Sequence, residues 1–401
     1  MRRLALTAIY ASLLLLAAGS VAWGLMRLAR GPAPSGPVQA AAQRYSYDIV
    51  RWHIYAVPQK LASWLGELRP GARRQSDDDV LIAFFARLRE LRALETTGAD
   101  LPSSLRYARA EALRRELKDM ENDVERVLER RLTAVLREQG ITLRPPLFQG
   151  VELVFPPVAV ELDAPPKVLA ISPRDHIELT AAYLLQPDLG ELERDAIEDR
   201  ASALGMAALV ADVGALGSYP SAVPPLLDYQ ALMETVAHEW VHQYLALFPL
   251  GRHYFRDDET RTLNETVANI AGRELGRLIV QRYPLPLPTA SQAPSPQVAS
   301  ELRQLRLDVE SLLARGQVKE AEQLMEAKRR ELAARGFYIR KINQAYFAFY
   351  GLYGDSPVST SSVGPKLTRL REESGSLARF LSRAAGITSV QELDTLLASS
   401  R

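Results

Sequence analysis

The chain contains no cysteine, and only five of its 401 residues are histidine. Disulfide bonds, iron–sulfur clusters and zinc sites built from thiolates are therefore excluded. Any bound metal must be held by histidine, aspartate or glutamate. The formal net charge is +1, so the composition gives no electrostatic basis for nucleic-acid binding, and we expect no nucleic-acid partner.

Charge is also absent from one long stretch near the N-terminus. Residues 4–26 are 23 uncharged residues, which at roughly 1.5 Å per residue can cross a hydrocarbon core of about 30 Å. Arg2 and Arg3 precede this run, which favours a cytoplasmic N-terminus. We predict that residues 1–28 are a single-pass membrane anchor with the folded body outside the cytoplasm. The alternative is a secreted protein, since the small residues at 17–20 fit a signal-cleavage site.

The rest of the chain predicts an α+β protein that is mainly α-helical. Leucines and valines spaced three and four apart predict a long helix over residues 103–138. Apolar runs at 151–162 and 207–213 predict a small sheet, which precedes helices over about 228–248 and 262–280. The predicted order is a linker (29–44), a helical region (45–145), a core with the small sheet (146–282), a proline-rich loop (283–296), a helical hairpin (297–336) and a C-terminal part of the core unit (337–401).

The first of these two helices carries the sequence His238-Glu239-Trp240-Val241-His242. His238 and His242 are four residues apart, so on a helix both imidazoles lie on one face and can bind one metal at about 2.0–2.1 Å. Glu239 is next to the first histidine around the helix, where a general base for a metal-activated water is needed. The alternative is a helix with two incidental histidines, and the residues that follow weigh against it.

The second helix offers the third ligand. Glu265, Asn269 and Gly272 lie on one helix face at i, i+4 and i+7. Glu265 would complete a three-residue metal site that leaves a fourth position open, and Asn269 could hydrogen-bond a ligating histidine. Two alternatives stay open. Glu265 could belong to a capping box that starts at Thr262, and the acids at 257–259 could supply the ligand instead.

His238-Glu239-x-x-His242 followed by Asn264-Glu265-x-x-Ala268-Asn269 resembles the gluzincin clan of zinc metallopeptidases, which includes thermolysin and the zinc aminopeptidases. The resemblance covers residues 205–280 and implies a zincin-like catalytic core, with Zn²⁺ as cofactor and a peptide or protein as substrate. It implies ligation by His238, His242 and Glu265, and support of the ligands by Asn264 and Asn269. The glycine–x–methionine–glutamate–asparagine signature of the best-known zinc aminopeptidases is absent from this sequence.

The resemblance also implies a mechanism and a substrate-binding strand. Glu239 would take a proton from the attacking water, and a downstream tyrosine or histidine would stabilise the oxyanion. Tyr346 and Tyr350 are the leading candidates for that donor, with Tyr353 and His253 also considered. A strand at 208–213 would bind the substrate backbone, with Ala211 and Gly214 as its contacts. The alternative function is a non-catalytic membrane-tethered helical scaffold with a structural or vestigial metal site.

Overall fold

The computed structural model describes residues 37–66, 76–96, 103–144, 152–226, 228–287 and 296–399. The predicted anchor or signal, residues 1–28, lies outside the described residues. Within them, no helix has both the length and the apolar character that a bilayer crossing requires. Helical structure already begins inside the predicted linker, with α2 (Pro37–Ala42) and η1 (Gln43–Tyr45).

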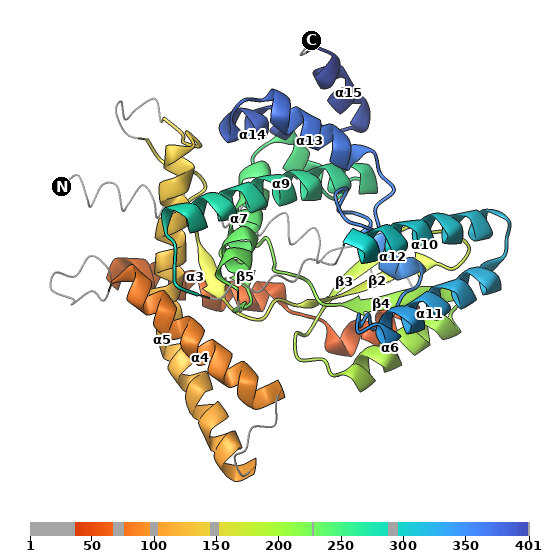
Figure 1. Cartoon of the computed structure of the whole chain (residues 1–401), viewed down its shortest axis with the longest axis horizontal. Coiled ribbons are helices and arrows are strands. Elements are labelled where there is room, and N and C mark those ends of the chain that lie inside the picture. The colour runs from red at the N-terminus through yellow and green to blue at the C-terminus, as the bar shows by residue number, and fades with distance from the viewer. Residues whose placement is uncertain are drawn as a thin grey trace.

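The architecture is α+β and mainly helical, as the sequence predicts (Figure 1). One sheet has the antiparallel order β3-β2-β4, and a second small sheet pairs β1 with β5 in parallel. The predicted runs at 151–162 and 207–213 include β1 and overlap β4, whereas β2, β3, β5 and the helix α6 that packs against β4 lie outside them. The strands and this helix are β1 (Val160–Leu162), β2 (Lys167–Pro173), β3 (Ala181–Leu185), α6 (Glu191–Ala203), β4 (Met206–Ala211) and β5 (Ser221–Val223).

The helical N-terminal region consists of α3 (Ile49–Gly66), α4 (Asp77–Thr96) and α5 (Ser103–Glu138). The long helix predicted over residues 103–138 is confirmed. Figure 1 shows α4 and the first half of α5 projecting together from the body of the protein. Their shared face buries large apolar side chains such as Leu81, Phe84 and Leu113. The burial of this apolar face explains why the pair forms an antiparallel hairpin.

The predicted helical hairpin is also confirmed, as α10 (Pro296–Ala314) and α11 (Val318–Ala334). The chain then continues through α12 (Gln344–Tyr350), α13 (Val363–Glu373), α14 (Leu377–Ala385) and α15 (Val390–Ala398). Helices α13 and α14 are separated at Gly375, which has a φ of 69°. This left-handed conformation is readily available to glycine and ends a helix.

Two helices at the centre of the protein pack antiparallel along their length: α7 (Tyr229–Leu245) and α9 (Asp258–Arg282), joined through the short α8 (Pro249–Arg252). Two glycines of α9 allow this contact. A Cβ atom at Gly272 would lie 2.9 Å from Cα of His238, and one at Gly276 would lie 2.8 Å from Cα of Glu234. Any larger side chain would push the helices apart, so Gly272 and Gly276 permit the close approach of α9 to α7.

A buried charge cluster joins β1 to α3 and α5. Lys60 of α3 is 2% exposed, and its Nζ lies 2.6 Å from Glu125, 3.3 Å from Glu129 and 3.6 Å from Glu161. Glu125 also accepts a hydrogen bond from the backbone N–H of Leu162. Three carboxylates surround one ammonium group. Burial, and then the charge of Glu125, raise the pKa of Glu161 from an ordinary 4.5 to about 7.

This cluster predicts a pH-dependent stability. Because the folded-state pKa of Glu161 is raised, its contribution to stability is fully present below about pH 4.5 and is lost as the pH rises through 7. We compare the free energy of unfolding of the Glu161→Gln variant with that of the wild type. We expect this difference to shift in favour of the variant by about 1–3 kcal/mol between pH 5 and pH 8. Chemical denaturation at both pH values measures this difference. The matched control is Glu191→Gln, at an exposed position of α6; an identical pH response in both variants would contradict the prediction.

Candidate metal centre

The two histidines of α7 lie one helical turn apart and aim their Nε2 atoms at the same point. The two Nε2 atoms are 2.9 Å apart, and the rings meet edge to face with centroids 4.6 Å apart. The cap of the helix is Asp228, whose carboxylate accepts a hydrogen bond from the backbone N–H of Ala231. Both histidine side chains are 15% exposed, so the site reaches solvent on one side only.

Glu265 of α9 completes the group. Its Oε2 lies 3.6 Å from Nε2 of His238 and 3.4 Å from Nε2 of His242. A zinc ion with ligand distances of about 2.0–2.1 Å places tetrahedral donors roughly 3.3 Å from one another, close to these separations. The structure therefore confirms that His238, His242 and Glu265 form a group that could hold a metal ion. The residues present fit zinc in number, type and spacing.

The two alternatives that we considered, a capping role for Glu265 and a ligand from the acids at 257–259, are both wrong. Helix α9 begins four residues before Thr262, and its cap is Asp257, which accepts hydrogen bonds from the backbone N–H and the hydroxyl of Thr260. Glu265 therefore lies at the start of the third turn and caps nothing. Asp257 is engaged as the cap, and Asp258 pairs with Arg261 at 3.0 Å. Glu259 accepts a hydrogen bond from the backbone N–H of Val390.

Two neighbouring side chains orient the ligands. Nδ1–H of His242 donates to Oδ1 of Asn264 at 2.7 Å, so in the neutral imidazole Nε2 is the nitrogen available to a metal. The hydroxyl of Tyr254 donates to Oε1 of Glu265 and so leaves Oε2 directed at the imidazoles. Sequence reasoning missed Tyr254, because it lies in the loop after α8, where no periodic pattern applies. His253, the neighbouring candidate, is exposed and bonds the carbonyl of Pro249.

Glu239 is buried beside the ligand group, with 5% of its surface exposed. Burial raises the pKa of its carboxyl, against the influence of His238 and His242. Burial also lowers the pKa of His242, but the carboxylates of Glu265 and Glu239 outweigh it and raise that pKa to about 9. For Glu265 the two imidazoles outweigh burial and hold the pKa well below its ordinary value. These shifts show that the site attracts positive charge.

The segment between β4 and β5 passes over Glu239. A Cβ atom at Gly217 would lie 3.1 Å from Oε2 of Glu239 and 3.3 Å from Cβ of His242. Leu216 pairs with Ala222 of β5 through backbone hydrogen bonds in both directions. Gly214 is exposed at the start of this segment. Gly217 was not among the residues that we expected at the site, although it lies in the same glycine-containing loop.

The outer edge of β4, by contrast, is covered by side chains. The backbone N–H of Val210 donates to Glu198 at 2.7 Å, and its carbonyl accepts from Arg340 at 3.1 Å. The carbonyl of Ala208 accepts from Asn343. Ala211 lies at the end of β4 and pairs with Val168 of β2. The loop after β4, through Gly217, is therefore the part of this region that lies beside Glu239 and His242.

Of the three candidate tyrosines, Tyr353 is the one that lies near the carboxylates. The charge of Glu265, then burial, then the charge of Glu239 raise its pKa well above 10. Tyr346 and Tyr350 pack on each other and against the three-stranded sheet, with ring centroids 4.9 Å apart. The charge that acts most strongly on Tyr350 is that of Asp212. The structure therefore brings Tyr353 towards the metal group, but not Tyr346 or Tyr350.

The loop that carries Tyr353 is fastened to α9. The backbone N–H of Gly354 donates to the hydroxyl of Thr266 at 2.9 Å. Asp355 accepts a hydrogen bond from Nδ2 of Asn269 at 3.0 Å and pairs with Arg273. Asn269 therefore contacts Asp355, whereas we expected it to bond a ligating histidine. Its role is to position the loop of Tyr353.

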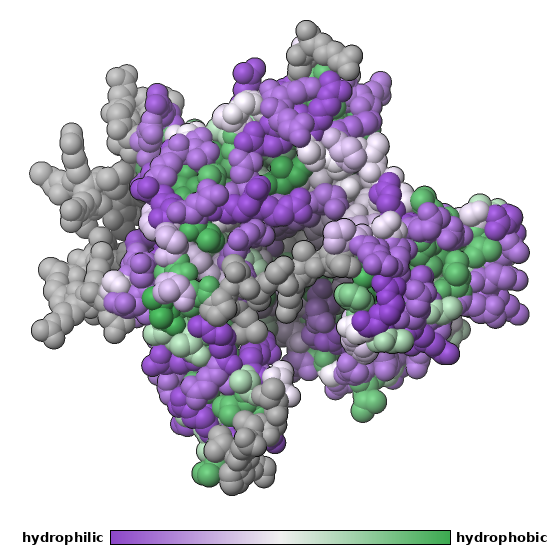
Figure 2. All heavy atoms as spheres, in the orientation of Figure 1, coloured by the Kyte–Doolittle hydropathy of each residue, from purple (hydrophilic) through white to green (hydrophobic). Residues whose placement is uncertain are grey.

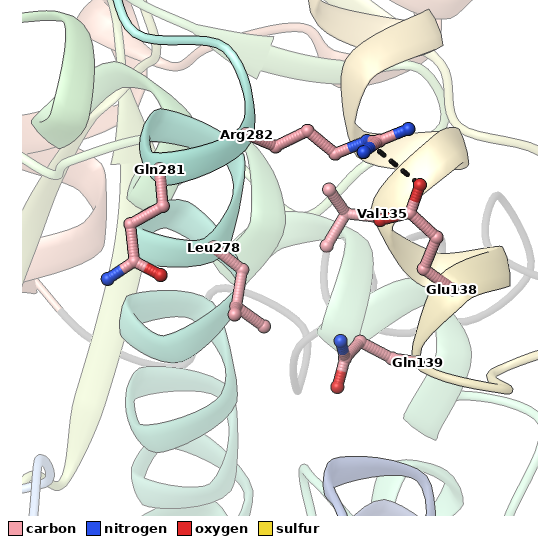
Figure 3. A pocket seen from close by; sticks show the side chains of 6 residues that line it. All are labelled: Val135, Glu138, Gln139, Leu278, Gln281 and Arg282. Carbon is pink, nitrogen blue, oxygen red and sulfur yellow. Dashed lines mark ion pairs between the residues drawn. The ribbon is translucent and has the colours of Figure 1, made fainter.

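A surface pocket between the C-terminal ends of α5 and α9 is separate from this site (Figure 3). Its wall includes Leu278 and an ion pair of 2.8 Å between Glu138 and Arg282. Leu278 lies thirteen residues after Glu265 on the same helix, which is about 20 Å along the axis. The pocket therefore contributes nothing to the metal group.

No protein-family model, curated protein or solved structure matches this chain.

The bond between Tyr254 and Glu265 predicts a loss of metal affinity on its removal. In the Tyr254→Phe variant Oε1 of Glu265 has lost its buried donor, and the carboxylate can rotate away from the imidazoles. We expect zinc affinity to fall by about 10–100-fold, measured by competition with a chromogenic chelator. Tyr244→Phe on α7 is the matched control and should bind zinc as the wild type does. Equal affinity in the two variants would show that Tyr254 does not orient the ligand.

Proposed function

We propose that this protein is a zinc metallopeptidase that hydrolyses peptide bonds, with His238, His242 and Glu265 as the zinc ligands. One observation carries the proposal: three metal-binding side chains converge from two helices, and a buried second carboxylate, that of Glu239, lies beside them. A structural site needs only ligands, whereas a hydrolase also needs a base close to them. The sequence order of these residues, with its resemblance to gluzincins, supports the same conclusion.

Zinc, when bound, would polarise the scissile carbonyl and make water acidic enough to lose a proton near neutral pH. Glu239 accepts that proton and returns it to the leaving amine. Burial suits Glu239 to this role because a raised pKa brings the carboxyl closer to working pH. Asn264 and Tyr254 keep the ligands in place throughout the reaction.

Tyr353 supplies the donor to the oxyanion that develops on the scissile carbonyl. Its raised pKa keeps the hydroxyl protonated, as a hydrogen-bond donor must be. Thr266 and Asn269 fix its loop to the same helix that carries Glu265. The hydroxyl of Tyr353 and the carboxylate of Glu265 therefore keep a constant distance from each other.

The substrate is an extended peptide that lies along Gly214–Gly217. Leu216 pairs with β5, and the backbone N–H of Ser218 donates to the carbonyl of Leu216 at 2.8 Å, so the chain turns at Gly217. Ala215, before this turn, can direct its backbone groups to a substrate strand. The lack of a side chain at Gly217 leaves space next to Glu239 for the scissile bond. We place this body outside the cytoplasm, tethered by residues 1–28.

The first test removes the general base. Glu239→Gln keeps the size of the side chain but cannot accept a proton, so we expect peptide hydrolysis to fall by about 10²–10⁴-fold with one zinc still bound per chain. Hydrolysis of a quenched fluorescent peptide library and zinc analysis of the same samples measure both quantities. Glu234→Gln, one turn earlier on α7, is the matched control. Wild-type chain that binds zinc and cleaves no peptide would instead favour the non-catalytic scaffold.

The second test concerns the oxyanion donor. Tyr353→Phe should lower kcat by about 10²–10³-fold with little change in KM, because the donor acts on the transition state. The matched control is Tyr350→Phe, three residues earlier, which should retain nearly full activity. A large loss in Tyr350→Phe and none in Tyr353→Phe would reverse the assignment. Steady-state kinetics on one cleaved peptide decide between the two tyrosines.

A further inference from the structure

Helix α3 has two faces with apolar side chains, and within the part of the chain that the structure describes only the inner face is covered. Its inner face is buried against the protein through Ile49, Ala56 and the base of Lys60. On the outer face Val50, Ile54 and Tyr55 are 45%, 65% and 58% exposed. Pro58 and Ala62, also exposed, continue the stripe at four-residue spacing. An amphipathic helix of a soluble domain would carry polar residues on that side.

The chain length indicates what covers the outer face. Residues 27–36 are the ten residues between the uncharged run and α2, and they reach at most about 36 Å. Helix α3 follows α2 and η1 directly. If residues 4–26 cross a bilayer, α3 is therefore among the first folded elements next to its surface. Arg51 is exposed within this face, one residue after Val50, and Arg44 is exposed in η1 before the helix; both fit anionic lipid headgroups.

We propose that the outer face of α3 lies in the interface of the lipid bilayer and orients the protein on the membrane. Apolar and aromatic side chains with adjacent arginines are the composition that binds there. The proposal rests on the anchor expected at residues 1–28 and is independent of the peptidase activity. It gives the protein a second membrane contact, which holds the body in one orientation on the bilayer.

The absence of cysteine makes the test direct, because a single introduced thiol can be labelled without background. Full-length chain carrying Ile54→Cys is labelled with a polarity-sensitive fluorophore and reconstituted into phosphatidylcholine–phosphatidylglycerol vesicles. Leu192→Cys is the matched control, since Leu192 is an exposed leucine of α6. We expect nitroxide-labelled lipid to quench the label at position 54 several-fold more than the label at 192.

A second reporter controls for local effects of the label. With Ala62→Cys as the labelled site, the substitutions Val50→Ser, Ile54→Ser and Tyr55→Ser should largely abolish quenching while the chain stays in the vesicle fraction. Equal quenching at positions 54 and 192 would overturn the proposal. So would a label that is shielded from aqueous iodide but not quenched by lipid, since the chain itself or a second copy would then cover the face. A chain that does not associate with vesicles at all would also overturn the proposal, because the proposal rests on the expected anchor.

Discussion

The close contact between α7 and α9 is the constraint on which the candidate site depends. Glu234 lies against Gly276 and His238 against Gly272, and His242 bonds Asn264. These pairs follow one antiparallel line along the two helices. Because glycine removes the Cβ atoms from the line, the helices approach closely enough for a short glutamate side chain on one to meet the imidazoles of the other. The ligand group is thus a consequence of helix packing.

That packing places two carboxylates and two imidazoles in a largely buried space, which is costly without compensation. Tyr254 and Asn264 supply hydrogen bonds to the ligands, but neither carries a charge. The carboxylates of Glu265 and Glu239 raise the pKa of His242, and the two imidazoles lower that of Glu265. A divalent cation would balance the charge of the two carboxylates directly. The arrangement contributes little to stability by itself, which supports the proposed metal site.

Sequence reasoning predicted the features that repeat along one helix and missed those that depend on contacts between distant segments. The pattern His238-Glu239-x-x-His242 required only helical periodicity, as did α5 and the hairpin of α10 and α11. The role of Glu265 stayed open because it depends on where α9 begins, four residues earlier than expected. Tyr353 lies beyond the end of α12, so it does not share the sheet-facing side of Tyr346 and Tyr350. Tyr254 and Gly217 reach the site only through loops.

Helix α9 links the two halves of the proposed chemistry because it presents two different faces. One face, with Asn264, Glu265 and Gly272, meets α7, while Thr266, Asn269 and Arg273 hold the loop of Tyr353. The second set has helical spacing of three and four residues, so it forms a continuous stripe. A rigid helix with both stripes fixes the distance from the third ligand to the tyrosine hydroxyl. Asn269 is therefore better explained by the demands of this second stripe than by support of a histidine.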